Sequence, residues 1–112
     1  MTDQETEEKI LLRIHALIDA LIRSYGKMYP ERSSQFLSDI TYLIMPGRRY
    51  HKVIMEDNQR SVHAFVDRKT GDVYKPASWN APAVHVRYNL LDDESFETCI
   101  EKADWAGSYL YL

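Results

Sequence analysis

The residues best suited to ligand chemistry lie in one stretch of the chain, where aromatic rings alternate with cationic and amide side chains. A ring can stack on a nucleotide base, lysine and arginine can meet phosphate oxygens, and asparagine can read a polar edge. We therefore predict a site for a phosphate-bearing ligand at Tyr74, Lys75, Trp79, Asn80, Arg87, Tyr88 and Asn89. In the structural alternative, Trp79 fills the core and Arg87 pairs with an acidic residue of the last helix.

A second group of basic side chains precedes this stretch and consists of Arg48, Arg49, His51, Lys52, Arg60 and His63. On a hairpin that turns near Asp57 and Asn58, His51 and His63 are expected to come close to opposite one another. Two histidines with a lysine nearby can perform general acid and base chemistry on a phosphodiester. Solvent-facing histidines on a sheet, however, need no function.

Other catalytic or metal-binding signatures are absent from the sequence. It contains no G-x-S-x-G, P-loop, H-E-x-x-H or dinucleotide motif, and its histidines share no metal-ligand spacing with the single cysteine, Cys99. We predict no catalytic residue, no metal and no cofactor. Cys99 is expected to be an inert core thiol, and the acids between Asp92 and Asp104 a solvated helix face.

The charges of the chain are distributed unevenly. Residues 1–45 carry 5 basic and 7 acidic side chains, residues 46–91 carry 8 and 4, and residues 92–112 carry 1 and 6. A basic middle segment attracts phosphate locally without making the whole protein a polyanion binder. Alternatively, the oppositely charged segments pair with each other in the fold or between subunits.

Two helices are predicted in the first half of the chain. Thr2 and Glu5 fit a capping box, and apolar residues follow at helical spacing from Ile10 to Tyr25. Gly26 and the Tyr29-Pro30 step end this helix. Ser33 or Ser34 would cap a second helix that ends at Pro46-Gly47, with an apolar face formed by Phe36, Leu37, Ile40, Leu43 and Ile44.

Antiparallel strands and a last helix are predicted in the second half. Tyr50–Met55, Val62–Val66 and Asp72–Lys75 read as strands, separated by turns at 56–59 and 67–71, and 84–90 reads as a further edge strand. Asp92 would cap a helix that runs to about Ala103. The predicted class is α+β in one domain, 1–112: two helices in 1–47, an antiparallel sheet of three to four strands in 48–91, and a helix with an apolar tail in 92–112.

The sequence also bears on location. No apolar run approaches the roughly 18 residues of a membrane span, and the N-terminus is acidic where a signal peptide would be basic. We expect no membrane association and a reducing compartment.

Part of the sequence resembles a family of small proteins encoded by tailed bacteriophages. The resemblance covers Ser61–Tyr111 and rests on Gly71-Asp72-Val73-Tyr74-Lys75, Ser78-Trp79, Pro82-Ala83, Arg87-Tyr88-Asn89-Leu90 and Ala103-Asp104-Trp105-Ala106-Gly107-Ser108-Tyr109. It implies a phage protein that works in the host cytoplasm. The resemblance carries no catalytic residues over to this chain.

These observations lead to three functional hypotheses. The first is a non-enzymatic phage accessory protein that binds a small phosphate-bearing ligand, with counter-defence by sequestering a host nucleotide signal or by blocking a host protein. The alternatives are a protein that binds single-stranded nucleic acid, and a small metal-independent nuclease or phosphodiesterase built on the two histidines. The apolar tail and the long first helix indicate a homo-oligomer.

Overall fold

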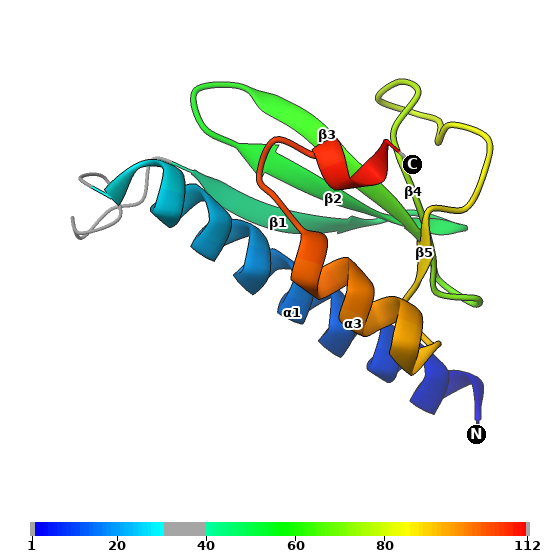
Figure 1. Ribbon diagram of the computed structural model, residues 1–112. Coiled ribbons are helices and arrows are strands. Elements are labelled where there is room, and N and C mark those ends of the chain that lie inside the picture. Colours follow the sequence, from blue (N-terminus) through cyan, green and yellow to red (C-terminus); the bar gives the residue numbers. More distant parts are fainter. Residues whose placement is uncertain (1, 31–39, 112) are drawn as a thin grey trace.

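The computed structural model describes residues 2–30 and 40–111, and it confirms the α+β class (Figure 1). In chain order, the elements are α1 (Asp3–Met28), β1 (Thr41–Pro46), β2 (Tyr50–Glu56), β3 (Arg60–Asp67), β4 (Asp72–Tyr74), β5 (Tyr88–Asn89), α3 (Asp93–Lys102) and the 3-10 turn η1 (Ser108–Leu110). The strands form one antiparallel sheet in the order β1-β2-β3-β4-β5.

The first helix begins as its sequence predicts. The Thr2 side chain accepts from the Glu5 backbone N–H at 3.1 Å, and the Glu5 carboxylate accepts from the Thr2 N–H at 3.3 Å, which completes the capping box. The buried residues of α1 recur at helical spacing and are Ile10, Ile14, Leu17, Ile18, Ala20, Leu21 and Tyr25. This stripe is the face that α1 packs on the sheet.

The second predicted helix is wrong over its described residues. Leu43 and Ile44 lie in strand β1, which pairs antiparallel with β2, so the sheet has five strands in place of three to four. The segment Thr41–Met45 is short, uncharged and rich in β-branched and aromatic residues, and in such a run apolar spacing does not separate helix from strand. Pairing with β2 decided the outcome. The predicted cap at Ser33 or Ser34 lies outside the described residues.

The two predicted turns join β2 to β3 and β3 to β4. Gly71 has a φ of +77°, and a methyl group added there would lie 3.0 Å from the Leu91 side chain, so the turn requires glycine. Between β2 and β3 the register shifts: Val53 faces Ala64 whereas Ile54 faces Val62. His63 is the extra residue of this β-bulge.

The fourth predicted strand is shorter than expected, because only Tyr88 and Asn89 of the segment 84–90 pair with β4. Before them, the chain forms a loop that Pro76 and Pro82 close through an isolated bridge. The Ala83 N–H donates to the Lys75 carbonyl at 2.7 Å across the base of the loop. The two prolines remove donors that a longer strand would need.

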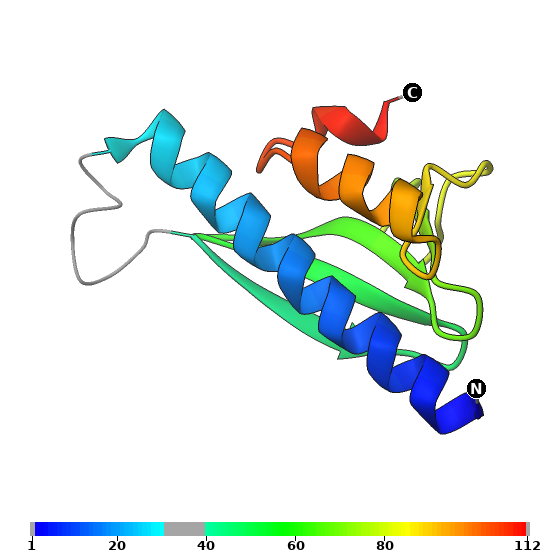
Figure 2. The same cartoon turned by 60° about the horizontal axis from the view of Figure 1, so that its bottom comes forward.

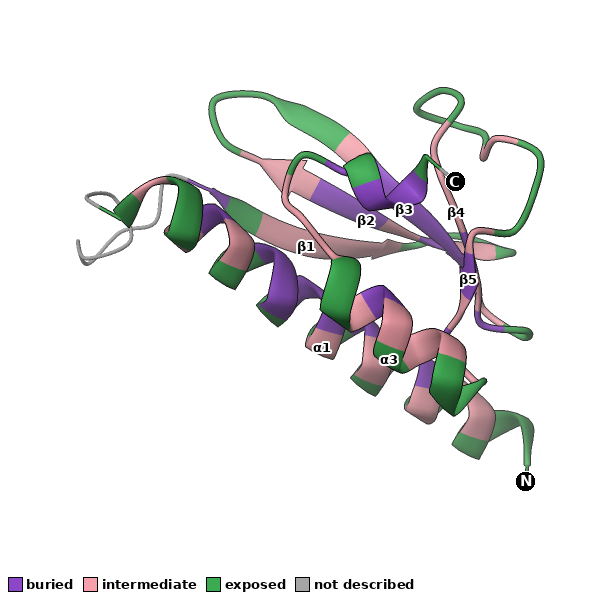
Figure 3. Ribbon diagram, in the orientation of Figure 1, coloured by how far each residue is buried: buried purple, intermediate pink, exposed green. Residues whose placement is uncertain are grey.

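Both helices cover the same face of the sheet, and α1 crosses that face diagonally with α3 beside it (Figure 2). The core lies between these layers, where Figure 3 shows the buried stripe of α1 against buried strand residues. Asp92 caps α3 as predicted, and Cys99 on α3 is fully buried. Burial raises the pKa of the Cys99 thiol to about 12. No described helix is both long and apolar enough to span a bilayer.

Candidate functional site

The face of the sheet opposite the helices carries a cluster of rings that we call the aromatic face, made of Tyr50, Phe65, Tyr74 and Trp79 with Lys52 between them. Tyr50 lies edge-on to both Phe65 and Tyr74, with ring centroids 5.8 Å apart in each pair. Strand alternation places these side chains together, because Lys52 faces Phe65 and Phe65 faces Tyr74 across the sheet. Phe65 is buried, whereas Tyr50 and Tyr74 are half-buried.

Trp79 joins this face from the loop. Its side chain is 42% exposed, and the Lys52 ammonium nitrogen lies 4.9 Å from the centre of its ring. Lys52 also lies 5.9 Å from the Phe65 ring. Trp79 therefore does not fill the core. The structure brings two residues of the predicted loop site, Tyr74 and Trp79, to the same sheet face as Lys52 of the second basic group.

Three other residues of the predicted loop site lie at different places. The Lys75 ammonium lies 4.1 Å from the centre of the Tyr111 ring, which is 68% exposed. Asn80 is exposed at the loop tip. Arg87 donates its backbone N–H to Val73 at 2.7 Å, and its Nε is buried without a hydrogen-bond partner.

Tyr88 and Asn89, which the sequence predicts as ligand contacts, make structural contacts in the fold. Tyr88 is buried in the core, and its hydroxyl donates to the Tyr109 carbonyl at 3.0 Å. The Asn89 amide donates to Thr70 and Asp72 and accepts from the N–H groups of residues 91 and 92. Asn89 thereby fixes the turn that leads into α3, and its polar atoms are already used.

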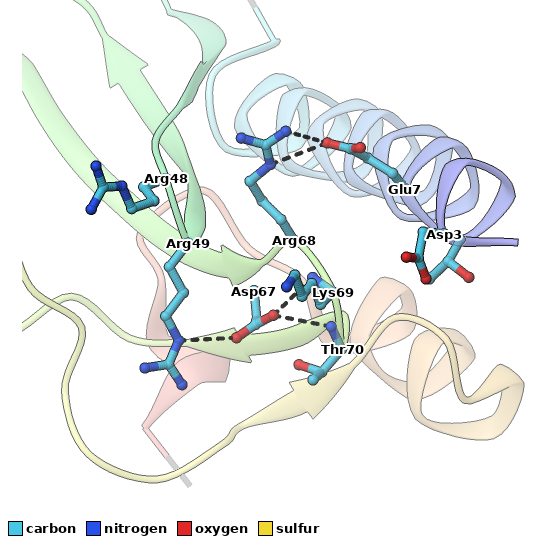
Figure 4. A pocket seen from close by; sticks show the side chains of 9 residues that line it. Asp3, Glu7, Arg48, Arg49, Asp67, Arg68, Lys69 and Thr70 are labelled. Carbon is cyan, nitrogen blue, oxygen red and sulfur yellow. Dashed lines mark hydrogen bonds and ion pairs between the residues drawn. The ribbon is translucent and has the colours of Figure 1, made fainter.

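A basic cleft of about 760 Å³ adjoins the start of β2, between the first turns of α1 and the turns that follow β1 and β3 (Figure 4). Its cations are Arg48, Arg49, Arg68 and Lys69, and its acids are Asp3, Glu7 and Asp67. Four cations against three carboxylates leave the lining with a small positive excess.

Two of the cations are held by carboxylates. Arg49 contacts Asp67 at 3.3 Å, and Arg68 forms an ion pair with Glu7 while donating to the Gly47 carbonyl at 2.7 Å. Burial would raise the pKa of Asp67, but hydrogen bonds from two backbone N–H groups and from Arg49 hold it below its usual value. The hydrogen bond from Arg68 lowers the pKa of Glu7.

The remaining cations, Arg48 and Lys69, form no ion pair within the described part of the chain, and both are exposed. Arg48 points away from the Arg49–Asp67 pair (Figure 4). Arg49 connects the cleft with the aromatic face, because its guanidinium carbon also lies 5.1 Å from the centre of the Tyr50 ring. A phosphate could thus contact the cations of the basic cleft while a planar ring contacts the adjoining aromatic face.

His51 and His63 do not form the predicted acid–base pair. His51 faces Val66, three residues from His63 along β3, and both histidines are buried beneath the helices. The His63 Nε2 lies 2.8 Å from the Tyr109 hydroxyl, and burial lowers the pKa of His63 to about 4. Burial, and then the charge of Arg68, lower the pKa of His51. The nuclease hypothesis loses its two residues.

The sequence did not predict several residues of the aromatic face and of the basic cleft, and it grouped Arg60 with residues from which the structure separates it. Arg60 forms an ion pair with Glu56 across the far hairpin, away from the cleft. Tyr50, Phe65, Arg68 and Lys69 were not predicted as site residues. Alternation along two paired strands signals Tyr50 and Phe65. In the described ranges, no three histidine, cysteine or acidic side chains are grouped to hold a metal ion.

Comparison with known proteins gives one finding. The model of a family of unknown function (DUF7717) matches residues 1–112. No curated protein matches the chain, and no solved structure matches it either.

Proposed function

The chain belongs over its whole length to this family of unknown function, and we propose that it is a non-enzymatic protein that binds a small phosphate-bearing ligand. The ligand's planar ring lies on the aromatic face beside Trp79, and its phosphate meets cations at the edge of the basic cleft. The observation that carries the proposal is that cations contact rings on this face, Arg49 with the half-buried Tyr50 and Lys52 with the exposed Trp79.

Burial and contact favour a stacking role for Trp79. A tryptophan that is 42% exposed, with its ring against one lysine, keeps surface free for a base. Stacking on an aromatic ring is worth about 1–3 kcal/mol per base. The half-buried Tyr50 and Tyr74 lie on the same sheet face as Lys52, the residue that contacts Trp79.

The phosphate contacts of the proposal are Lys52, Arg48, Lys69 and Arg87. Lys52 already lies over Trp79, and Arg48 and Lys69 have no carboxylate partner in the described ranges. Arg87 is partly exposed, and its guanidinium is the fourth cation of the proposal. Few phosphate contacts and a cleft of limited volume fit a single nucleotide-sized molecule better than a long strand.

The resemblance of Ser61–Tyr111 to tailed-phage proteins supports a setting for this binding. A phage accessory protein in the host cytoplasm would use such a site to sequester a host nucleotide signal, or would use the same surface to block a host protein. In this proposal the protein acts by binding its ligand without changing it chemically, because the two buried histidines do not form an exposed acid–base pair.

The test is calorimetric titration with ribonucleoside monophosphates and triphosphates, with the matching nucleosides and inorganic phosphate as controls. We expect a nucleotide to bind at least about tenfold more tightly than either of its parts. Trp79→Ala and Lys52→Ala should each weaken binding about tenfold or more, whereas Lys102→Ala, at an exposed position on α3, should not.

The stability of the variants separates binding from packing. Because Trp79 is nearly half exposed, Trp79→Ala should lower the free energy of unfolding by less than the about 3–5 kcal/mol of a core tryptophan. Absence of binding to every nucleotide, or equal binding by wild type and both variants, contradicts the proposed site. Nanomolar affinity for a long single-stranded oligonucleotide would favour the nucleic-acid alternative.

A further inference from the structure

Strand β1 forms one edge of the sheet, and within the described residues its outer side has no paired strand. Exposed edges normally carry lysine, proline or a bulge that prevents pairing with another chain. The segment Thr41–Met45 has none of these, and only Pro46 at its end lacks a donor. This edge is five consecutive uncharged residues, of which Thr41, Tyr42 and Ile44 have high β-propensity.

Hydrogen bonding to β2 shows which backbone groups point outward. The Gly47 N–H donates to the Tyr50 carbonyl at 2.8 Å, and the β1–β2 register continues without a shift to Thr41 opposite Glu56. Because bonded residues alternate along an antiparallel pair, Leu43 and Met45 also bond to β2. Tyr42 and Ile44 therefore direct their N–H and C=O groups away from the sheet.

A groove of about 520 Å³ lies beside the edge, between β1 and α1. Its apolar lining includes Leu11, Ile18, Tyr42 and Ile44, and Glu7, His15, His51 and Arg68 line the remainder. Helix α3 packs on the other flank of α1, where Arg13 contacts Asp93. On the groove side, Ile22 follows Ile18 by one turn and is 39% exposed.

We propose that a second copy of this chain covers the edge by antiparallel β1–β1 pairing, which forms one continuous ten-stranded sheet. A two-fold axis normal to the sheet brings the two grooves, with their apolar residues Tyr42 and Ile44, together on the same face. Pairing Tyr42 with Ile44 of the second copy satisfies all outward N–H and C=O groups of both residues. That register places Leu43 on the axis and sets Pro46, which lacks an N–H, opposite residue 40, which lies outside β1.

The charges of α1 fit the same arrangement. The axis sets the two copies of α1 antiparallel on one side of the joined sheet. The first turns of α1 carry Asp3, Glu5, Glu7 and Glu8, and its last turns carry Arg23 and Lys27. Each acidic end therefore lies toward the basic end of the other copy, whereas a parallel arrangement would oppose like charges.

The experiment is disulfide trapping of the full chain with Leu43→Cys. Residues that face each other at a non-bonded antiparallel position have Cα atoms about 4.5 Å apart, within the range of a disulfide. We expect mild oxidation to give a crosslinked dimer. The matched control is Met45→Cys, because two copies of residue 45 would lie about 14 Å apart, four residues along the strand. Native Cys99 is fully buried, so wild type gives the background.

The mass of the unmodified protein gives an independent readout. Light scattering at micromolar concentration should show a dimer, and Leu43→Lys, which puts two ammonium groups on the axis, should raise the dimer dissociation constant at least about tenfold with unchanged far-UV circular dichroism. A monomeric wild type overturns the proposal. Crosslinking of Leu43→Cys no faster than of wild type or of Met45→Cys also overturns it, even if a dimer exists.

Discussion

At the scale of the single residue, burial decides what the titratable side chains can do. His63 is the extra residue of a β-bulge, and its ring lies against Tyr42 and Tyr109, where water does not compete for its nitrogen. The cost of burying a charge keeps this imidazole neutral. A side chain that alternation alone would have placed near a reactive surface is therefore part of the core.

His63 should make stability depend on pH. Its pKa is about 4 in the folded protein and about 6.5 in the unfolded chain, so the unfolded chain binds more protons between these values. The free energy of unfolding should fall by about 3 kcal/mol as pH drops from 6.5 to 4. His63→Gln, which retains a hydrogen bond to Tyr109, should lose less over this window in denaturant titrations.

Other groups titrate in both the wild type and His63→Gln. The difference between their curves of unfolding free energy against pH therefore isolates the contribution of His63. Asp67 and Asp104 also have lowered pKa values and make the protein less stable at low pH in each case. Parallel curves for wild type and His63→Gln would contradict the assignment. A variant curve that falls less steeply than that of the wild type between pH 6.5 and 4 supports it, with His51, whose pKa is also lowered, contributing the same slope to both.

Arg87 should show opposite effects on stability and on binding. Its Nε is buried without a hydrogen-bond partner. Removing this donor from water lowers the free energy of unfolding, and packing does not offset the loss. Arg87→Met keeps most of the apolar stem and removes the charge, so the free energy of unfolding should stay level or rise. Nucleotide affinity should fall about tenfold, the effect of losing one charge-assisted hydrogen bond. A large loss of stability with unchanged affinity would show that Arg87 is scaffold.

At the scale of the element, the docking of α1 against α3 depends on one arginine. The Arg13 guanidinium lies 4.3 Å from the centre of the Phe96 ring, and its nitrogens contact Asp93 at 2.8 Å and the Leu90 carbonyl at 2.9 Å. These three contacts connect α1 to the start of α3 and to the chain just after β5. Sequence spacing predicted both helices but not this connection.

Arg13→Ala should lower the free energy of unfolding by about 1.5–3 kcal/mol, the range for hydrogen bonds to charged groups. The matched control is Lys9→Ala on the same helix, whose ammonium lies 3.9 Å from the same Asp93 carboxylate. Because that contact is long and solvent-exposed, the control should cost under about 1 kcal/mol. Urea unfolding measures both, and equal losses would contradict the role given to Arg13.

At the scale of the whole molecule, the sheet has one covered face and one open face. The helices and the C-terminal turn pack on the first, and the aromatic face lies on the second. The excess of basic residues in 46–91 is partly neutralised within the fold, since Arg49, Arg60 and Arg68 each meet a carboxylate. The cations left for a ligand are few.

Ligand binding should therefore depend only weakly on salt. A small ligand that makes one to three phosphate contacts should give a plot of log Kd against log salt concentration with a slope of about 1–3. A long single strand would release many more counterions and give a steeper slope. Titrations of a nucleotide and of an oligonucleotide at several salt concentrations measure this. A steep slope for the nucleotide would mean that more cations take part than the structure leaves free.

The sequence by itself determined the elements whose signals are local. The capping box at Thr2, the helical stripe of α1, the turn at Gly71 and the Asp92 cap each depend on neighbouring residues, and each was predicted. Only the tertiary structure decided β1, because a short apolar segment gains its hydrogen bonds from β2 and not from itself. It also decided the site: the bulge turned His63 inward, and burial removed Tyr88 from the surface. Side chains distant in sequence, such as Lys52 and Trp79, meet because the loop folds onto the sheet. Residue spacing within one segment cannot predict such a contact.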